Sequence, residues 1–132
     1  ILGLIQQMIT AYKIIKEGWN GYNVLHRAAA RVGALDIGFV PGKGGKDTAD
    51  IIAGINHEII EAVFLLGADE VDMAHINNAF VIYQGHHGDK AAHKADVILP
   101  GAAYTEKNAI YVNMEGRVQR THQAVSPPGE AK

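Results

Sequence analysis

Three short, continuous apolar runs set the strongest limit on how this chain can fold. They cover residues 63–66, 80–83 and 97–99, and their first residues lie 17 positions apart each time. Each run is followed within two residues by a glycine, at Gly67, Gly85 and Gly101. Continuous apolar strands are typical of parallel sheets covered by helices on both faces, and this spacing leaves about a dozen residues for each crossover. The pattern therefore predicts an α/β fold with a doubly wound, mostly parallel sheet covered by helices.

In the amino-terminal third of the chain, the apolar residues are spaced as in helices. Apolar residues at intervals of three and four predict a helix over residues 1–16, which Gly18 and the turn around it should end. A second helix is expected from about Asn23, with its apolar positions on one side and Gly33 at its end.

Two further elements are expected around the three strands. Asp47 or Thr48 can cap a short helix that runs through about Ile55. Residues 110–113 and 117–121 flank a turn that contains a glycine, which predicts a C-terminal strand pair or hairpin.

Composition places the chain among ordinary globular domains. It has 132 residues, of which 48% are hydrophobic and 20% charged, so a single α/β domain over residues 1–132 is expected. The formal charge of −2 gives no reason to expect a nucleic-acid partner, and no apolar run is long enough for direct membrane insertion. The absence of cysteine excludes disulfides, thiolate catalysis and cysteine-bound zinc or iron–sulfur clusters on this chain. Ile1 is no start residue and the end is rich in proline, so a fragment of a longer chain is expected.

The glycine-rich segment 41–46 invites comparison with a phosphate-binding loop. A Walker loop needs a glycine, four residues and then Gly-Lys-Ser/Thr. In one register Gly38 lies too close to Gly42, and Gly44 stands where the hydroxyl is needed. In the other register Val40 occupies the position of the first glycine. The segment is therefore predicted to be a surface loop.

The best candidate cluster for chemistry follows the second apolar run. His86, His87 and Asp89, with His93 nearby, come at the expected carboxyl end of a strand, where open α/β sheets build their sites. Two histidines and a carboxylate could bind zinc or iron. Adjacent histidines tend to point apart, however, and no second cluster completes a coordination sphere, so a structural loop is favoured over a metal site. The role of His86, His87 and Asp89 stays open.

The other candidate residues favour structural roles. Asp69, Glu70 and Asp72 could act as paired carboxylates, but an acidic loop that caps the next helix is the simpler interpretation. Residues 57–61 begin with His-Glu but lack the second histidine of the zinc motif HExxH, so they are predicted to form a helix end. Ser126 precedes two prolines and lacks the glycine elbow of serine hydrolases. The residues by themselves therefore predict an α/β domain without a self-contained active site.

Six stretches of sequence carry a close resemblance to one protein family. They begin at residues 18, 23, 65, 83, 95 and 112 and read GWNG, NVLH, LLGADE, YQGHHGD, ADVILPGAAYTEK and VNMEGRVQ. Together they resemble the large iron–sulfur subunit of proton-pumping NADH:quinone oxidoreductase, respiratory complex I, in its α-proteobacterial and mitochondrial branch. The resemblance runs from about residue 18 to residue 132.

The resemblance implies the carboxyl-terminal part of that subunit, which is built like the molybdopterin oxidoreductases. Residues 95–100 are similar to the Ala-Asp-Val-Val-Leu-Pro segment of formate dehydrogenases and nitrate reductases, and residues 113–117 to their Asn-x-Glu-Gly-Arg segment. Those enzymes often carry Thr-Glu-Thr near the pterin dinucleotide, where this chain has residues 86–89. The resemblance therefore implies a fold that has lost the molybdenum cofactor. No catalytic, cofactor-binding or metal-binding residue is expected on this segment, and iron–sulfur clusters are expected elsewhere in the parent subunit.

The same resemblance implies a structural role within a larger assembly. The parent enzyme passes electrons from NADH through flavin and iron–sulfur clusters to quinone while it pumps protons. The implied partners are other subunits of its peripheral arm, on the cytoplasmic face of a bacterial inner membrane or the matrix side of the mitochondrial inner membrane. Under this hypothesis Glu106, Glu115 and Arg117 serve structure, for instance through a charge-assisted pair that braces the hairpin.

Two alternatives remain open at the level of sequence. One is a fragment of a working molybdopterin-dependent oxidoreductase. The other is a small-molecule binding module that uses the crevice between Asp69 and residues 85–89.

Overall fold

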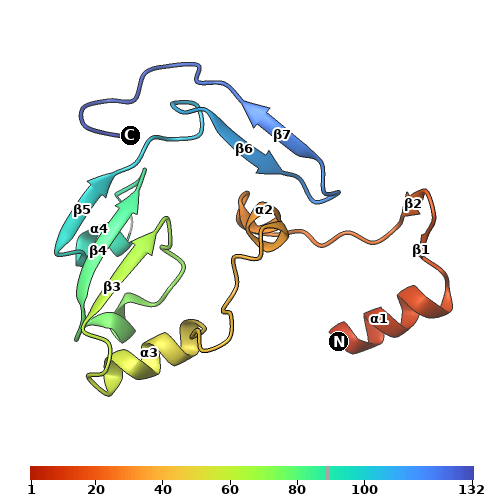
Figure 1. Cartoon of the computed structure of the whole chain (residues 1–132), viewed down its shortest axis with the longest axis horizontal. Coiled ribbons are helices and arrows are strands. Elements are labelled where there is room, and N and C mark those ends of the chain that lie inside the picture. The colour runs from red at the N-terminus through yellow and green to blue at the C-terminus, as the bar shows by residue number, and fades with distance from the viewer. Residues whose placement is uncertain (89) are drawn as a thin grey trace. The chain divides into compact units, whose positions relative to one another are not determined.

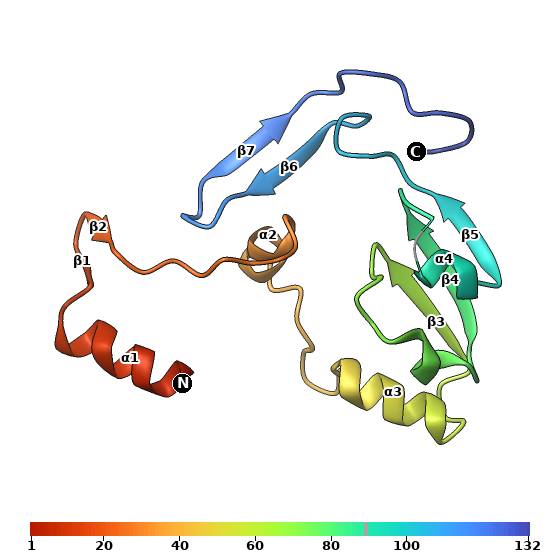
Figure 2. The same ribbon diagram turned by 180° about the vertical axis from the view of Figure 1, so that it is seen from behind.

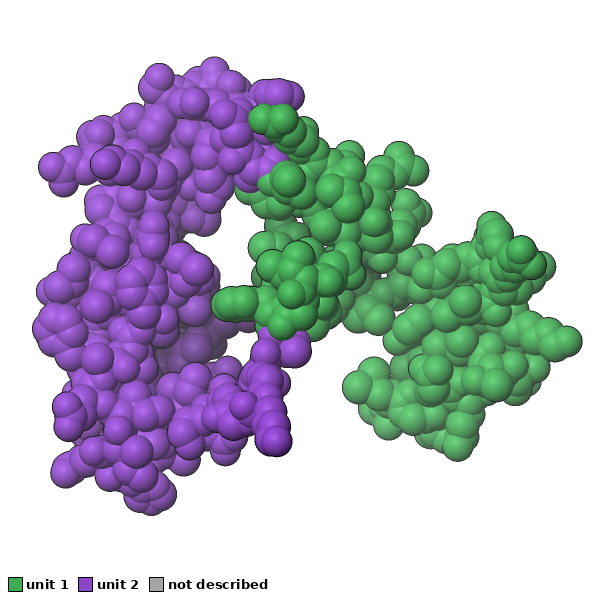
Figure 3. Space-filling view, in the orientation of Figure 1, with its two compact units in different colours: residues 1–39, 110–120 green, residues 40–109, 121–132 purple. Residues whose placement is uncertain are grey.

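The structure, a computed structural model, describes residues 1–88 and 90–132 (Figures 1 and 2). It divides into two compact units, one of residues 1–39 with 110–120 and the other of residues 40–109 with 121–132 (Figure 3). The single domain expected over residues 1–132 stays a prediction.

The second unit contains the three predicted strands as a parallel sheet. The strands β3 (Ala62–Leu66), β4 (Phe80–Gly85) and β5 (Val97–Pro100) lie in the order β3-β4-β5. Both strand pairs are parallel, and Phe64, Ile82 and Val97 lie side by side in register. The predicted α/β fold with a parallel sheet and helices is therefore confirmed.

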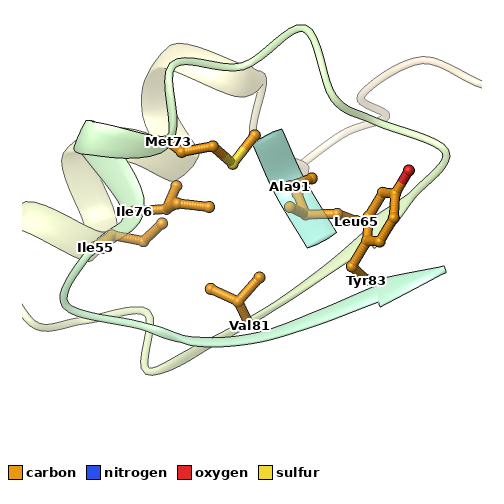
Figure 4. Packing of buried hydrophobic residues seen from close by; sticks show 7 residues of the cluster. All are labelled: Ile55, Leu65, Met73, Ile76, Val81, Tyr83 and Ala91. Atoms are coloured by element: carbon orange, nitrogen blue, oxygen red, sulfur yellow. The ribbon is translucent and has the colours of Figure 1, made fainter. Parts of the chain in front are cut away.

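Three helical segments pack on one face of this sheet. They are α3 (Thr48–Asn56), the 3-10 helix η1 (Met73–Ile76) and α4 (Lys90–Lys94). Their buried side chains meet those of the strands in one hydrophobic cluster, which consists of Ile55, Leu65, Met73, Ile76, Val81, Tyr83 and Ala91 (Figure 4). The cluster fixes the loops that follow β3 and β4, because each loop connects its strand to one of these helical segments.

The described residues of the second unit do not cover the opposite face of its sheet. Alternation along the strands puts six large apolar side chains on this face, together with Ala62 and Gln84. The six are Phe64, Leu66, Phe80, Ile82, Val97 and Leu99. Ile82 is half-buried, and the other five side chains are 38% to 66% exposed. The expectation that each strand is buried on both faces is therefore not met within the second unit.

Local hydrogen bonds define both ends of the helix α3. The side chain of Asp47 accepts a hydrogen bond from the backbone N–H of Asp50 at 2.9 Å, so the predicted cap is confirmed. At the other end Glu58 adopts a left-handed backbone with φ of 57°. The N–H of Ile59 then donates to the carbonyl of Gly54 at 2.9 Å, which closes the helix in a Schellman motif.

The first unit differs from the sequence prediction at both expected helices. The helix α1 spans Leu2–Ala11 rather than residues 1–16, because Lys13 adopts a left-handed backbone with φ of 50°. A small antiparallel hairpin follows, formed by β1 (Ile15–Lys16) and β2 (Trp19–Asn20). A lysine at such a position is uncommon, so the early end of the helix carried no clear signal in the sequence.

The second expected helix also starts later than predicted. Helix α2 spans Arg31–Asp36, so Gly33 lies inside it and does not end it. A Cβ atom at Gly33 would lie 3.4 Å from Cγ2 of Val112, an ordinary van der Waals distance, so packing does not require a glycine at this position. The helix instead ends at Gly38, whose φ is 71°.

The predicted C-terminal strand pair is confirmed. It consists of β6 (Ala109–Val112) and β7 (Val118–Thr121), joined by a short turn.

No helix in the described part of the chain is both long enough and apolar enough to cross a membrane.

Candidate functional site

A cavity of the second unit lies beside the carboxyl end of β3. Its volume is about 720 Å³, and it is open to solvent. The loop after β3 and the helix α4 line it with Asp69, Glu70, Val71, Asp72, Met73, Lys90, His93 and Lys94. The structure therefore brings the predicted acidic residues and His93 together.

The basic side of this cavity comes from α4, and of its three residues only His93 was a candidate from the sequence. Lys90, His93 and Lys94 lie at positions i, i+3 and i+4, which place them on one face of a helix. The spacing of these residues was the available signal in the sequence. The helix has only five residues, however, so the helical period is not repeated often enough to be recognised.

Among the carboxylates of the cavity, Asp72 has a clear structural role. Its Oδ1 accepts a hydrogen bond from the backbone N–H of Ala74 at 3.0 Å and so caps η1. Its Oδ2 lies 3.9 Å from Nε2 of His75, in a pair whose side chains are 71% and 56% exposed. Such an exposed pair contributes little to stability. The prediction of an acidic residue that caps the next helix is confirmed for Asp72.

The histidine pair after β4 does not line this cavity. The rings of His86 and His87 contact each other edge to face, with centroids 4.4 Å apart and planes inclined at 72°, so the expectation that they point apart is wrong. Asp89, the third member of the predicted cluster, lies outside the described residues. Within residues 1–88 and 90–132, no group of three His, Cys, Asp or Glu side chains is placed to hold a metal ion.

Tyr83 fixes the end of β4 next to this pair. Its side chain is 2% exposed, and its hydroxyl donates a long hydrogen bond of 3.4 Å to the carbonyl of His87. A Cβ atom on Gly85 would overlap the phenol ring of Tyr83. The glycine that follows the second apolar run is therefore required by packing.

The segment 95–100, which carries part of the resemblance, has a structural explanation. The carboxylate of Asp96 accepts a hydrogen bond from the N–H of Val81 at 2.7 Å, and the N–H of Asp96 donates to the carbonyl of Val81 at 2.8 Å. These two bonds join the start of β5 to β4. Asp96 therefore fixes the register between β5 and β4.

The segment 113–117 forms the turn of the β6–β7 hairpin. Oδ1 of Asn113 accepts hydrogen bonds from the backbone N–H groups of Glu115 and Arg117 at 3.0 and 2.9 Å. Gly116 has a φ of 81°, which favours glycine. Asn113 therefore organises the turn, a role that the sequence analysis did not assign to it.

The three charged residues of the structural hypothesis do not form the expected pair. Oε2 of Glu106 accepts from the N–H of Ala103 at 2.9 Å, and Oε2 of Glu115 lies 3.5 Å from Nδ2 of Asn113. Among the described residues, no ion pair joins Arg117 to Glu106 or Glu115. Their structural role stays a prediction, and the charge-assisted pair that illustrated it is not observed.

The remaining candidate segments lie where the structural interpretation placed them. Residues 41–46 form an exposed loop, with the N–H of Gly45 bonded to the carbonyl of Gly42 at 2.8 Å. His57 follows the last residue of α3 as its C-cap. Ser126 is exposed near the C-terminus.

The parallel sheet, with a cavity beside the carboxyl end of one strand, defines an α/β domain of the kind that binds ligands or cofactors there. The whole chain, residues 1–132, matches the family of molybdopterin oxidoreductases. The chain belongs to this family.

Within this family, the chain is similar to subunits of NADH-quinone and NADH-ubiquinone oxidoreductases. The chain is 48% identical over 132 residues to a subunit of the NADH-quinone oxidoreductase of Rickettsia bellii, a match that covers 100% of this chain and 18% of the relative. It is 52% identical over 124 residues to the mitochondrial NADH-ubiquinone oxidoreductase 78 kDa subunit of Neurospora crassa, which covers 92% of this chain and 15% of the relative. The NADH-ubiquinone oxidoreductase 75 kDa subunit of Reclinomonas americana is 46% identical over 134 residues, which covers 100% of this chain and 18% of the relative. The chain spans less than a fifth of the length of each of these relatives.

The lining of the cavity offers both signs of charge, because Asp69, Glu70 and Asp72 lie in the same cavity as Lys90 and Lys94. The carboxylates oppose the negative phosphates of a pterin dinucleotide, whereas the two lysines attract them. The chain also has no cysteine thiolate to offer a metal.

Proposed function

We propose that this chain is a structural segment of the large iron–sulfur subunit of proton-translocating NADH:quinone oxidoreductase. In this proposal the whole subunit passes electrons from NADH through flavin and iron–sulfur clusters toward quinone, and residues 1–132 belong to a larger α/β region that bears no cluster. The observation that carries the proposal is the identity of 48% over the full chain to a subunit of NADH-quinone oxidoreductase.

The contacts of three polar side chains support a structural role. Asp96 bonds to Val81, Asn113 organises a turn, and Asp72 caps η1. Each of these side chains has a backbone partner, so its chemistry is directed at the fold. Rigid packing of this kind suits a segment that holds electron carriers at fixed distances.

The proposed partners are other subunits in the peripheral arm of the complex. The proposed location is the cytoplasmic face of a bacterial inner membrane or the matrix side of the mitochondrial inner membrane. The relatives include bacterial and mitochondrial proteins, which supports either setting.

Variants in the intact complex test this proposal. Asp69→Asn, His93→Gln and Lys94→Gln change the cavity, and we expect NADH:quinone turnover per assembled complex to stay at the level of the unmodified protein. Ile55→Asp places a charge in the core of the second unit, and we expect it to lower the amount of assembled complex. Loss of turnover in correctly assembled cavity variants would instead favour a binding or catalytic role for the cavity.

A further inference from the structure

The β1–β2 hairpin contains an asparagine followed by a glycine, Asn20 before Gly21, and the chain has no other such pair. Asparagine deamidates when the backbone nitrogen of the next residue attacks the side-chain amide, and a glycine leaves that nitrogen unshielded because it has no Cβ atom. Both residues are exposed, so water and base reach them. The pair therefore has the chemistry of a spontaneous modification site.

The backbone N–H of Tyr22 is placed to activate the amide of Asn20. It donates a hydrogen bond of 3.0 Å to Oδ1 of Asn20. When the nitrogen of Gly21 attacks Cγ of Asn20, negative charge develops on this same oxygen. A backbone donor at such a distance stabilises a developing oxyanion. Three consecutive residues therefore supply the electrophile, the nucleophile and a donor for the charge of the transition state.

The packing of the hairpin requires glycine at position 21 for a separate reason. A Cβ atom there would overlap the indole ring of Trp19 and lie 2.8 Å from the carbonyl oxygen of Ile14. A larger residue would have to displace the ring or the neighbouring backbone. The hairpin therefore keeps the glycine that makes Asn20 reactive.

The hairpin also restrains the attacking nitrogen. The N–H of Gly21 donates to the carbonyl of Ile14 at 3.0 Å, and this hydrogen bond must break before the nitrogen can attack. The strands β1 and β2 have only two residues each, and an isolated two-stranded hairpin is marginally stable. The net contribution of one backbone hydrogen bond corresponds to a slowing of about 2- to 10-fold. The hairpin should therefore delay the reaction without preventing it.

We propose that Asn20 is a site of spontaneous deamidation whose rate is set by the β1–β2 hairpin. The nitrogen of Gly21 forms a bond to Cγ of Asn20, the C–N bond of the side-chain amide breaks, and ammonia leaves with the proton that the backbone nitrogen gives up. Water then adds to one of the two carbonyl carbons of the cyclic imide and breaks its bond to nitrogen. The products are aspartate and isoaspartate, and no oxidant or reductant is needed.

The isoaspartate product would change the hairpin itself. It adds one carbon atom to the backbone at a residue that pairs with Ile15. A change of this kind shifts the pairing of the strand, and the new carboxylate adds a negative charge beside it. The proposal needs only residues 14–22, so it does not depend on the function proposed above.

Mass spectrometry of the purified complex that contains the full-length parent protein tests the proposal. The complex is incubated at mildly alkaline pH and digested with trypsin, which releases residues 17–27. We expect Asn20 to gain the mass of an NH2-to-OH exchange and to give both aspartate and isoaspartate. Asn23 lies in the same peptide, is exposed and is followed by Val24, so it serves as the internal control and should stay unchanged. A sample digested without incubation gives the background.

Two comparisons measure the effect of the hairpin on the rate. A synthetic peptide of residues 17–27 cannot form the hydrogen bond to Ile14, so its Asn20 should react about 2- to 10-fold faster than in the complex. The variant Trp19→Ala removes the ring that lies against Gly21, and its rate should rise toward that of the peptide.

Three results would overturn the proposal. No product at Asn20 above background in the complex, when the peptide reacts, would mean that the folded chain excludes the chemistry. Equal rates at Asn20 and Asn23 would mean that the following glycine is not the cause. A rate in the complex equal to that of the peptide, or unchanged in Trp19→Ala, would mean that the hairpin does not set the rate.

Discussion

The carboxylate of Asp96 and the backbone of Val81 form a two-point connection between neighbouring parallel strands. The side chain accepts from the N–H of Val81 at 2.7 Å, and the backbone N–H of Asp96 donates back to the Val81 carbonyl at 2.8 Å. Val81 is 3% exposed, so removal of the carboxylate takes the acceptor from the N–H of a buried residue. The pair therefore fixes the register in which β5 begins.

Replacement of Asp96 should loosen the sheet locally. We expect Asp96→Ala to lower the free energy of opening at Val81 by about 1–3 kcal/mol, because a buried donor loses its partner. Asp96→Asn keeps an acceptor oxygen and should lose less. Native-state hydrogen exchange at the amides of β4 and β5 measures the difference. Equal protection in Asp96→Ala and the unmodified protein would show that this connection does not stabilise the sheet.

The turn of the β6–β7 hairpin should depend on the side chain of Asn113. We expect Asn113→Ala to destabilise the hairpin by about 1–2 kcal/mol, because two backbone N–H groups lose their acceptor. Asn113→Asp retains the acceptor and serves as the matched control. Exchange rates of the β6 and β7 amides provide the measurement, and similar rates in both variants would contradict the assigned role.

Gly85 and Tyr83 should be energetically coupled. A methyl group at Gly85 overlaps the Tyr83 ring, so Gly85→Ala should be destabilising in the unmodified background. In a Tyr83→Leu background the ring is gone, and the added cost of Gly85→Ala should be much smaller. A double-mutant cycle on the midpoint of thermal unfolding measures this coupling. Additive effects would mean that the two residues do not interact.

The cap of α3 should contribute a measurable amount of stability. We expect Asp47→Ala to cost about 1 kcal/mol, because the N–H of Asp50 loses its acceptor. Asp47→Ser keeps a capping oxygen and should cost less. Protection of the amides in the first turn of α3 reports the effect, and indistinguishable protection in the two variants would argue against the cap.

The sheet could be predicted because its signal is local and strong. Residues 63–66, 80–83 and 97–99 are apolar without interruption and bounded by glycine, and all three form parallel strands at those positions. The cap of α3 was equally accessible, since an aspartate before a helical pattern has a specific bond to make.

The ends of the first two helices could not be predicted, because they depend on individual backbone conformations. Lys13, which follows α1, adopts a positive φ that a lysine side chain does not favour by itself. Gly33 was predicted to end the second helix, but it lies inside α2. The acidic residues of the cavity were candidates from the sequence, but Lys90 and Lys94 were not. These two lysines lie on a helix of five residues, which is too short to show a clear helical pattern in the sequence.

The central claim is that this segment is structural and carries no molybdopterin. The most direct measurement is the molybdenum and tungsten content of the purified full-length parent protein, in a preparation with proven NADH:quinone activity. The account predicts neither metal in a stoichiometric amount, together with full activity. One molybdenum or tungsten atom per parent chain, with activity lost when that metal is removed, would contradict it.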